Sequence, residues 1–133
     1  MNYHQTQIRV RYSETDQMRV VYHGNYAQYF EIGRVEWLRN QGISYKWMEE
    51  NGIMLPVVSL TMNYKKSARY DELLTLKTFL KKMSTVKIEF DYELYNEKEE
   101  LLTTGNSLLV FVDMKTGKPT SPPQYISDIL NRV

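Results

Sequence analysis

Residues 11–40 read RYSETDQMRVVYHGNYAQYFEIGRVEWLRN, and the second half of this stretch decides the fold. Its apolar and aromatic side chains recur at helical spacing, which predicts a helix over about residues 24–40. One stripe consists of Tyr26, Tyr29, Phe30, Gly33 and Trp37. Ile32, Val35 and Leu38 widen this stripe and leave only a narrow polar face. A helix with so broad an apolar surface is expected to be wrapped by another element rather than to lie on the outside of the protein.

Two details of this helix lead to structural expectations. The polar face consists of Gln28, Glu31 and Arg34. Glu31 and Arg34 lie three residues apart on that face, so an ion pair between them is expected. Gly33 costs roughly 1 kcal/mol in a helix interior. That cost is explained if another backbone approaches the helix closely at this position.

The rest of the chain follows a mainly β pattern. Apolar and polar side chains alternate up to Tyr12, which predicts a first strand over residues 6–12. Four further strands are expected over residues 55–66, 73–82, 85–95 and 101–113. Two short helices are expected as well, one over residues 44–50 with Ser44 as its cap and one that ends near Leu130. One long helix and a strongly curved antiparallel sheet of five strands together predict an α+β fold.

Composition limits the classes of function. The 133 residues contain no repeat and no linker, so one domain over residues 1–133 is expected. A formal net charge of +1 gives no argument for nucleic acid or for a membrane surface. The absence of cysteine excludes a disulfide framework and a thiolate nucleophile. No segment is typical of a signal peptide or of a membrane span, so a cytoplasmic location is expected.

The loop before the long helix carries one acid, Asp16, and leads into the helix through His23, Gly24 and Asn25. The first backbone N–H groups of a helix have no intrahelical partner, and the helix dipole places partial positive charge there. A carbonyl oxygen bound at this end would be polarised, with a carboxylate nearby to attack the carbonyl or to activate water. An isolated loop aspartate, in contrast, usually caps a turn.

The motif D-Q-M-x-V-V-Y-H-G-N-Y-x-x-Y-F-E-x-G-R-x-E spans Asp16 to Glu36. It strongly resembles the signature of the 4-hydroxybenzoyl-CoA thioesterase-like family. The resemblance implies the hotdog fold, in which a curved antiparallel sheet of five strands wraps a long central helix. It also implies that two protomers join edge to edge into one sheet, with active sites at the shared interface. A homodimer or a homotetramer is therefore expected.

By this resemblance, the chain is expected to be an enzyme, an acyl-CoA thioesterase that hydrolyses an acyl-CoA substrate to a free acid and CoA. Asp16 matches the family's catalytic carboxylate, which acts as a nucleophile or as a general base. The helix start at His23 and Gly24 matches its oxyanion site, where a backbone N–H polarises the thioester. The His23 imidazole could instead contact the substrate or orient Asp16. No cofactor is implied, and the sequence contains no metal-binding motif.

Three further positions of the motif are expected to contact the substrate. They are Tyr22, Asn25 and Tyr26. Asn25 could cap the helix or form a hydrogen bond in the site. The two tyrosines are expected in the core or in the pocket wall.

The sequence departs from the family pattern at Arg19, where related sequences have glycine. Glycine there would permit an unusual backbone angle or a close approach of the substrate. Arginine could instead contact an anionic group of the substrate such as a phosphate. Because CoA carries phosphates, Lys65, Lys66 and Arg69 are further candidates for contacts with it.

Two other classes of function compete with the thioesterase. Hotdog domains also serve as non-catalytic modules, which bind acyl thioesters or have a regulatory role. An acid beside an oxyanion site favours the enzyme, because a pure binder does not need one. A hotdog dehydratase usually pairs a histidine with an acid in a different motif, which this sequence lacks.

Overall fold

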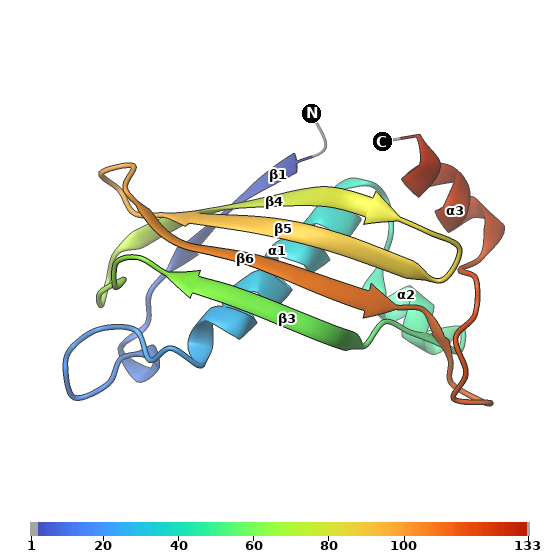
Figure 1. The fold of residues 1–133 in the computed structure, drawn as a ribbon, viewed down its shortest axis with the longest axis horizontal. Helices are drawn as coiled ribbons and strands as arrows, with labels where there is room; N and C mark the ends of the chain where they lie inside the picture. Colours follow the sequence, from blue (N-terminus) through green and yellow to red (C-terminus); the bar gives the residue numbers. More distant parts are fainter. Residues whose placement is uncertain (1–2, 133) are drawn as a thin grey trace.

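The helix predicted from residues 24–40 is α1, Asn25–Asn40, and it lies across one face of an antiparallel sheet (Figure 1). The structure, a computed structural model, describes residues 3–132. The five strands of the sheet follow the order β1-β4-β5-β6-β3. Their bounds are Tyr3–Arg9 for β1, Val57–Tyr64 for β3, Leu73–Met83 for β4, Lys87–Tyr95 for β5 and Leu101–Val110 for β6. The predicted α+β architecture is thereby confirmed.

Shorter elements connect and flank these strands. They are the 3-10 helix η1 (Tyr12–Glu14), the helices α2 (Tyr45–Glu50) and α3 (Gln124–Asn131), and the strands β2 (Ile53–Met54) and β7 (Val112–Asp113). The predicted cap of α2 is confirmed, because Ser44 Oγ accepts a hydrogen bond from the Trp47 N–H at 3.1 Å. Within residues 3–132, no helix has the length and apolar character needed to cross a membrane.

The first strand ends earlier than predicted. β1 stops at Arg9, and the backbone N–H of Val10 then donates to the carbonyl of Glu72 at 2.9 Å. Tyr12 belongs to η1 and is 77% exposed, with its ring packed edge-on against Tyr70. The prediction of Tyr12 as a buried strand residue was wrong because the chain turns away from the sheet before the alternating pattern ends.

Gly33 lies where α1 contacts β4. A Cβ atom at this position would lie 2.4 Å from Thr78 Oγ1 and 2.5 Å from Leu76 Cδ2. Side chains of the sheet therefore fill the space at Gly33, and not a second backbone as predicted. The absence of a side chain lets the helix lie close to the sheet.

Phe30, one turn before Gly33 on α1, packs closely against β5 and β6. Its ring stacks on the ring of Tyr92 with centroids 4.4 Å apart and planes 6° from parallel. A Cβ atom at Gly105, the cross-strand partner of Tyr92, would lie 2.3 Å from the Phe30 ring. Both rings are buried, so this stack fixes α1 over β5 and β6.

Arg34 does not belong to the polar face of α1. Only 7% of the residue is exposed, and its guanidinium donates to the hydroxyls of Tyr45 and Tyr92. Burial acts to lower the pKa of Arg34, but the two tyrosines together raise it. The expected ion pair with Glu31 is thus replaced, because acceptors beneath the helix hold the guanidinium away from solvent.

The loop between η1 and α1 is a tight turn. The Arg19 N–H donates to the carbonyl of Asp16 at 3.0 Å, and the Asp16 N–H donates to the carbonyl of Val20 at 2.9 Å. Arg19 has a φ of 65°, so it keeps the left-handed backbone that glycine would favour. The Val21 N–H donates to the carbonyl of Ala68 at 2.8 Å, which anchors the turn to the connection between β3 and β4.

Replacement of Gly105 by alanine should destabilise the fold. The added methyl group meets the rigid Phe30 ring, and overpacking of this kind costs about 1–3 kcal/mol. Urea unfolding of Gly105→Ala is expected to show this loss in the free energy of unfolding. Thr104→Ser, on the opposite face of the same strand, serves as the control and should change it by less than about 0.5 kcal/mol. An unchanged stability of Gly105→Ala would contradict this account of the packing.

Substitutions at Arg19 should reveal the cost of its left-handed backbone. Arg19→Gly is expected to be more stable than Arg19→Ala by about 1 kcal/mol, because alanine keeps the steric penalty that glycine avoids. Both variants remove the guanidinium, so the difference between their stabilities isolates the cost of the left-handed backbone. Thermal unfolding of the two variants measures it. Equal stabilities would show that the turn relaxes when the side chain changes.

Candidate active site

One cleft of about 300 Å³ brings together five of the residues that the sequence singled out, namely Asp16, His23, Tyr26, Lys65 and Lys66. Asp16 comes from the turn after η1, His23 directly precedes the N-cap of α1, and Tyr26 lies in the first turn of α1. Residues 64–67, at the end of β3 and just beyond it, form the opposite wall. The cleft therefore lies where the helix N-terminus meets the end of an edge strand.

The Asp16 carboxylate is exposed and only partly engaged. Its Oδ1 atom accepts a hydrogen bond from the Met18 N–H at 2.8 Å. Within residues 3–132, no group donates to Oδ2. One oxygen thus fixes the carboxylate, and the other has its lone pairs available. No cluster of three or more His, Asp or Glu side chains suited to a metal ion occurs in this part of the chain.

Two backbone donors are unused at the start of α1. Gly24 is the N-cap, and the N–H groups of Asn25 and Tyr26 donate to the carbonyls of Tyr22 and His23. The N–H groups of His23 and Gly24 meet no acceptor among the described residues. They lie at the positive end of a helix of 16 residues. An oxygen that develops negative charge could be bound there.

The His23 side chain is held by ring contacts. Its imidazole packs against the ring of Tyr22 with centroids 4.4 Å apart and lies edge-on to Tyr64 at 6.4 Å. No hydrogen bond joins it to Asp16 in the described structure. The backbone N–H of His23 is thus available as a hydrogen-bond donor, and its ring packs against the neighbouring rings at the cleft.

The remaining predicted residues lie around the cleft. Tyr26 is buried, and its hydroxyl accepts a hydrogen bond from the Ala68 N–H at 3.2 Å. Burial raises the pKa of this hydroxyl, so it stays neutral. The Asn25 amide donates to the carbonyl of Glu14 at 2.8 Å, and so it holds the preceding turn rather than capping α1. Tyr22 and Gly24 do not line the cleft of the single chain.

The ring of Tyr22 accounts for the glycine at position 24. A Cβ atom at Gly24 would lie 2.6 Å from the Tyr22 ring. A side chain at position 24 would therefore displace the ring, which in turn supports His23. Tyr22 and Gly24 thus shape the helix start without lining the cleft.

Tyr64 is a site residue that the sequence analysis missed. Its hydroxyl donates to the carbonyl of His23 at 3.4 Å, and its ring lies 5.4 Å from that of Tyr26. Lys65 and Lys66 follow it along the cleft wall. The two lysines at the end of a strand pattern were a signal for this wall, but no local pattern connects Tyr64 with a helix start 41 residues earlier.

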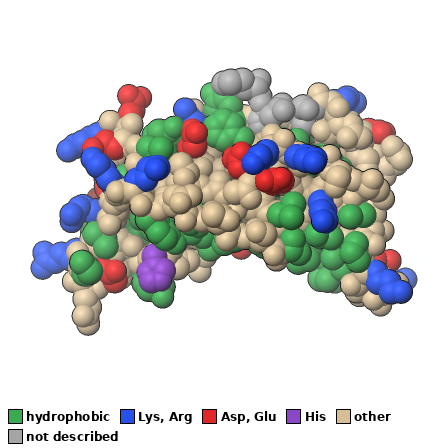
Figure 2. Space-filling view, viewed as in Figure 1, with side chains coloured by type: hydrophobic (Ala, Val, Ile, Leu, Met, Phe, Trp, Pro, Cys, Tyr) green, Lys and Arg blue, Asp and Glu red, His purple; other side chains and the backbone are tan. Residues whose placement is uncertain are grey.

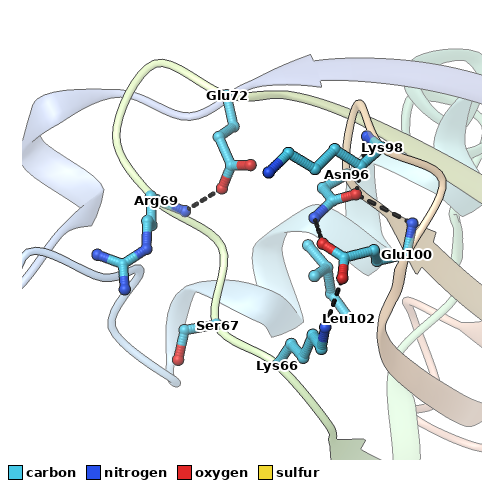
Figure 3. Close-up of a pocket in the computed structure, with 8 residues that line it drawn as sticks. All are labelled: Lys66, Ser67, Arg69, Glu72, Asn96, Lys98, Glu100 and Leu102. Carbon is cyan, nitrogen blue, oxygen red and sulfur yellow. Dashed lines mark hydrogen bonds and ion pairs between the residues drawn. The ribbon is translucent and has the colours of Figure 1, made fainter.

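A second cleft of about 390 Å³ adjoins the first and shares Lys66 and Ser67 with it (Figure 3). Lys66 forms an ion pair with Glu100, and its hydrogen bond lowers the pKa of that carboxyl. The side chains of Arg69 and Lys98 form no ion pair within residues 3–132. In Figure 3, the Arg69 guanidinium points away from the other lining residues. The second cleft thus extends the polar surface beyond Lys66.

Comparison with known proteins assigns the family. Residues 10–130 match the model of the thioesterase-like superfamily. The protein YneP of Bacillus subtilis is 36% identical over 119 residues, which cover 90% of this chain and 86% of YneP. The acyl-CoA thioester hydrolase YbgC of Escherichia coli O6:H1 is 31% identical over 119 residues, which cover 90% of this chain and 89% of YbgC.

A solved structure extends the match to three dimensions. The DHNA-CoA thioesterase of Staphylococcus aureus superposes with a TM-score of 0.93 at 44% identity, over 98% of this chain and 88% of that one. The sequence match, the superposition and the helix-on-sheet architecture agree over nearly the whole length. The chain therefore belongs to the thioesterase-like superfamily and has the hotdog fold.

Proposed function

We propose that this protein is an acyl-CoA thioesterase, which hydrolyses an acyl-CoA to a free acid and CoA. One observation carries the proposal. The partly free carboxylate of Asp16 lines the same cleft as His23, where the N–H groups of His23 and Gly24 have no described acceptor. A thioester carbonyl needs both an attacking group and a binding site for the charge on its oxygen. The named activities of YbgC and of the Staphylococcus aureus enzyme support the same reaction.

The chemistry follows from these positions. The thioester oxygen binds at the start of α1, where the two N–H groups stabilise the negative charge of the tetrahedral intermediate. Asp16 either attacks the carbonyl carbon, with an anhydride as the intermediate, or removes a proton from the attacking water. In both routes the C–S bond breaks, and the thiolate of CoA leaves and takes up a proton, from solvent in the first route and from the protonated Asp16 in the second. In the first route, water then hydrolyses the anhydride, which releases the free acid and restores the Asp16 carboxylate. Lys65 and Lys66 in the cleft wall suit the phosphates of CoA.

The exposed edge of the sheet supports a homodimer. Among the strands of residues 3–132, β3 pairs only with β6, and Leu60 and Tyr64 on this edge are 40% and 52% exposed. Hydrophobic side chains gather at both ends of the lower rim, along which β3 runs (Figure 2). An apolar edge of this kind is a template for pairing with a second copy.

A two-fold axis normal to the sheet makes the two β3 strands antiparallel. The Val57 end of the partner's β3 then lies beside Tyr64, at the cleft. Leu60 and Met62 pair in register with Ser107 and Gly105, whose strand carries the buried face toward α1. The acyl group accordingly lies between the protomers, against apolar side chains and near α1.

Replacement of Asp16 by asparagine tests the reaction. Asp16→Asn keeps the shape but removes the carboxylate, so kcat is expected to fall by about 10²-fold or more. Release of free thiol from short, medium, long and aromatic acyl-CoAs measures it for both proteins. A ligand that binds without any turnover would instead favour a binding module. Hydration of an enoyl thioester would favour a dehydratase, and full activity of Asp16→Asn would exclude this residue as the nucleophile or general base.

A charge on the β3 edge tests the dimer. Leu60→Lys places like charges opposite each other across the two-fold axis. The dissociation constant of the homodimer is therefore expected to rise by about tenfold or more. Sedimentation velocity over a range of concentrations measures it. Tyr125→Lys on α3 is the control, since Tyr125 is 41% exposed and α3 lies near the end of β4 rather than along β3 (Figure 1). Equal association of the two variants would exclude this edge as the interface.

A further inference from the structure

Glu14 contacts both sides of the turn that carries Asp16, although it does not line the cleft. It is the last residue of η1 and lies two positions before Asp16 in the chain. The residue is half-buried. Its side chain and its backbone carbonyl each accept two hydrogen bonds, from four different residues.

The Glu14 side chain connects η1 to α1. Glu14 Oε1 accepts hydrogen bonds from the Arg11 N–H at 2.8 Å and from the Tyr29 hydroxyl at 2.8 Å. Tyr29 lies in the buried stripe of α1 and has no exposed surface. Burial raises the pKa of Tyr29, and the bond to Glu14 raises it further, so the hydroxyl remains a donor.

The backbone carbonyl of Glu14 fixes the other end of the turn. It accepts hydrogen bonds from the Tyr22 N–H at 2.9 Å and from the Asn25 side-chain amide at 2.8 Å. Tyr22 precedes His23, and Asn25 is the first residue of α1. One residue thus holds the chain just before Asp16 and just before the unused N–H groups of the helix start.

We infer that Glu14 is a positioning residue for thioester hydrolysis, which sets the separation between the Asp16 carboxylate and the N–H groups of His23 and Gly24. The inference rests on the proposed function. Glu14 touches no reacting atom; it acts through the turn that it holds. A misplacement of about 1 Å between such groups can cost about 10²-fold in rate. A purely structural role in capping η1 would lower stability without this loss in kcat.

Four variants separate the two roles. Glu14→Ala removes the acceptor, Glu14→Gln keeps a carbonyl oxygen that can accept both bonds, and Tyr29→Phe removes only the donor on α1. Glu97→Ala is the matched control, because Glu97 Oε1 also accepts a backbone N–H, that of Leu73 at 3.1 Å, but outside the cleft. Each variant is assayed for kcat and KM on an acyl-CoA that the parent protein hydrolyses, and for its stability to urea.

The positioning role predicts a specific pattern. For Glu14→Ala, kcat is expected to fall by about 10- to 100-fold while KM changes by less than about threefold. Glu14→Gln should stay within about threefold of the parent, Tyr29→Phe should lie between them, and Glu97→Ala should match the parent. A Glu14→Ala enzyme with the parent's kcat would overturn the inference, as would a Glu14→Gln enzyme as impaired as Glu14→Ala. If Glu14→Ala does not fold, Tyr29→Phe decides the question by the same comparison.

Amide hydrogen exchange keeps this test separate from the proposed reaction. Glu14→Ala should speed exchange at the N–H groups of Asp16 and Tyr22, and Glu97→Ala should not. Unchanged protection in Glu14→Ala would overturn the positioning role whatever the activity. Parent protein that hydrolyses no acyl-CoA would contradict the proposed function, while the exchange data would still report on the turn.

Discussion

The packing of the helix on the sheet depends on the absence of a side chain at Gly105. The Phe30 ring occupies the space that a Cβ atom would need there and stacks on Tyr92 of the neighbouring strand. Gly33 provides a similar close approach to β4 one turn later along the helix. These contacts fix the middle of α1 on the sheet. Because a helix of 16 residues is stiff, they also fix the position of its N-terminus.

The candidate site follows from that position. The start of α1 lies beside the end of β3, where Tyr64 contacts the carbonyl of His23. The turn that carries Asp16 is held against the connection after β3 by the bond from Val21 to Ala68. The acid and the helix N-terminus therefore belong to one surface that hydrogen bonds hold together, although neither is deeply buried. Preorganisation of this kind is what stabilisation of a developing charge requires.

The sequence was informative where a periodic pattern coincided with burial. The stripe on α1 was predicted correctly, and so was the alternation of the strand expected over residues 85–95, which the structure has at Lys87–Tyr95. Each of the two elements buries one face against the other. Arg34 was misjudged, since its polar head finds the hydroxyls of Tyr45 and Tyr92 beneath the helix, and no local pattern reveals such acceptors. Tyr64 was missed for the same reason, because its partner is distant in the chain. The roles of the site residues, the single domain and the cytoplasmic location stay predictions.

The pairing of the Asp16 turn with the connection after β3 also has a consequence for folding. Val21 bonds to Ala68, and Val20 bridges to Arg69, across more than forty residues of chain. Contacts between segments so far apart form only after the intervening loop has closed, which is slow compared with helix formation. α1 can therefore form early while the acid and the helix start are still unaligned. The cleft is therefore expected to be assembled after α1, once β3 and β4 are in place, and a chain that ends before residue 68 lacks the two residues that anchor the Asp16 turn.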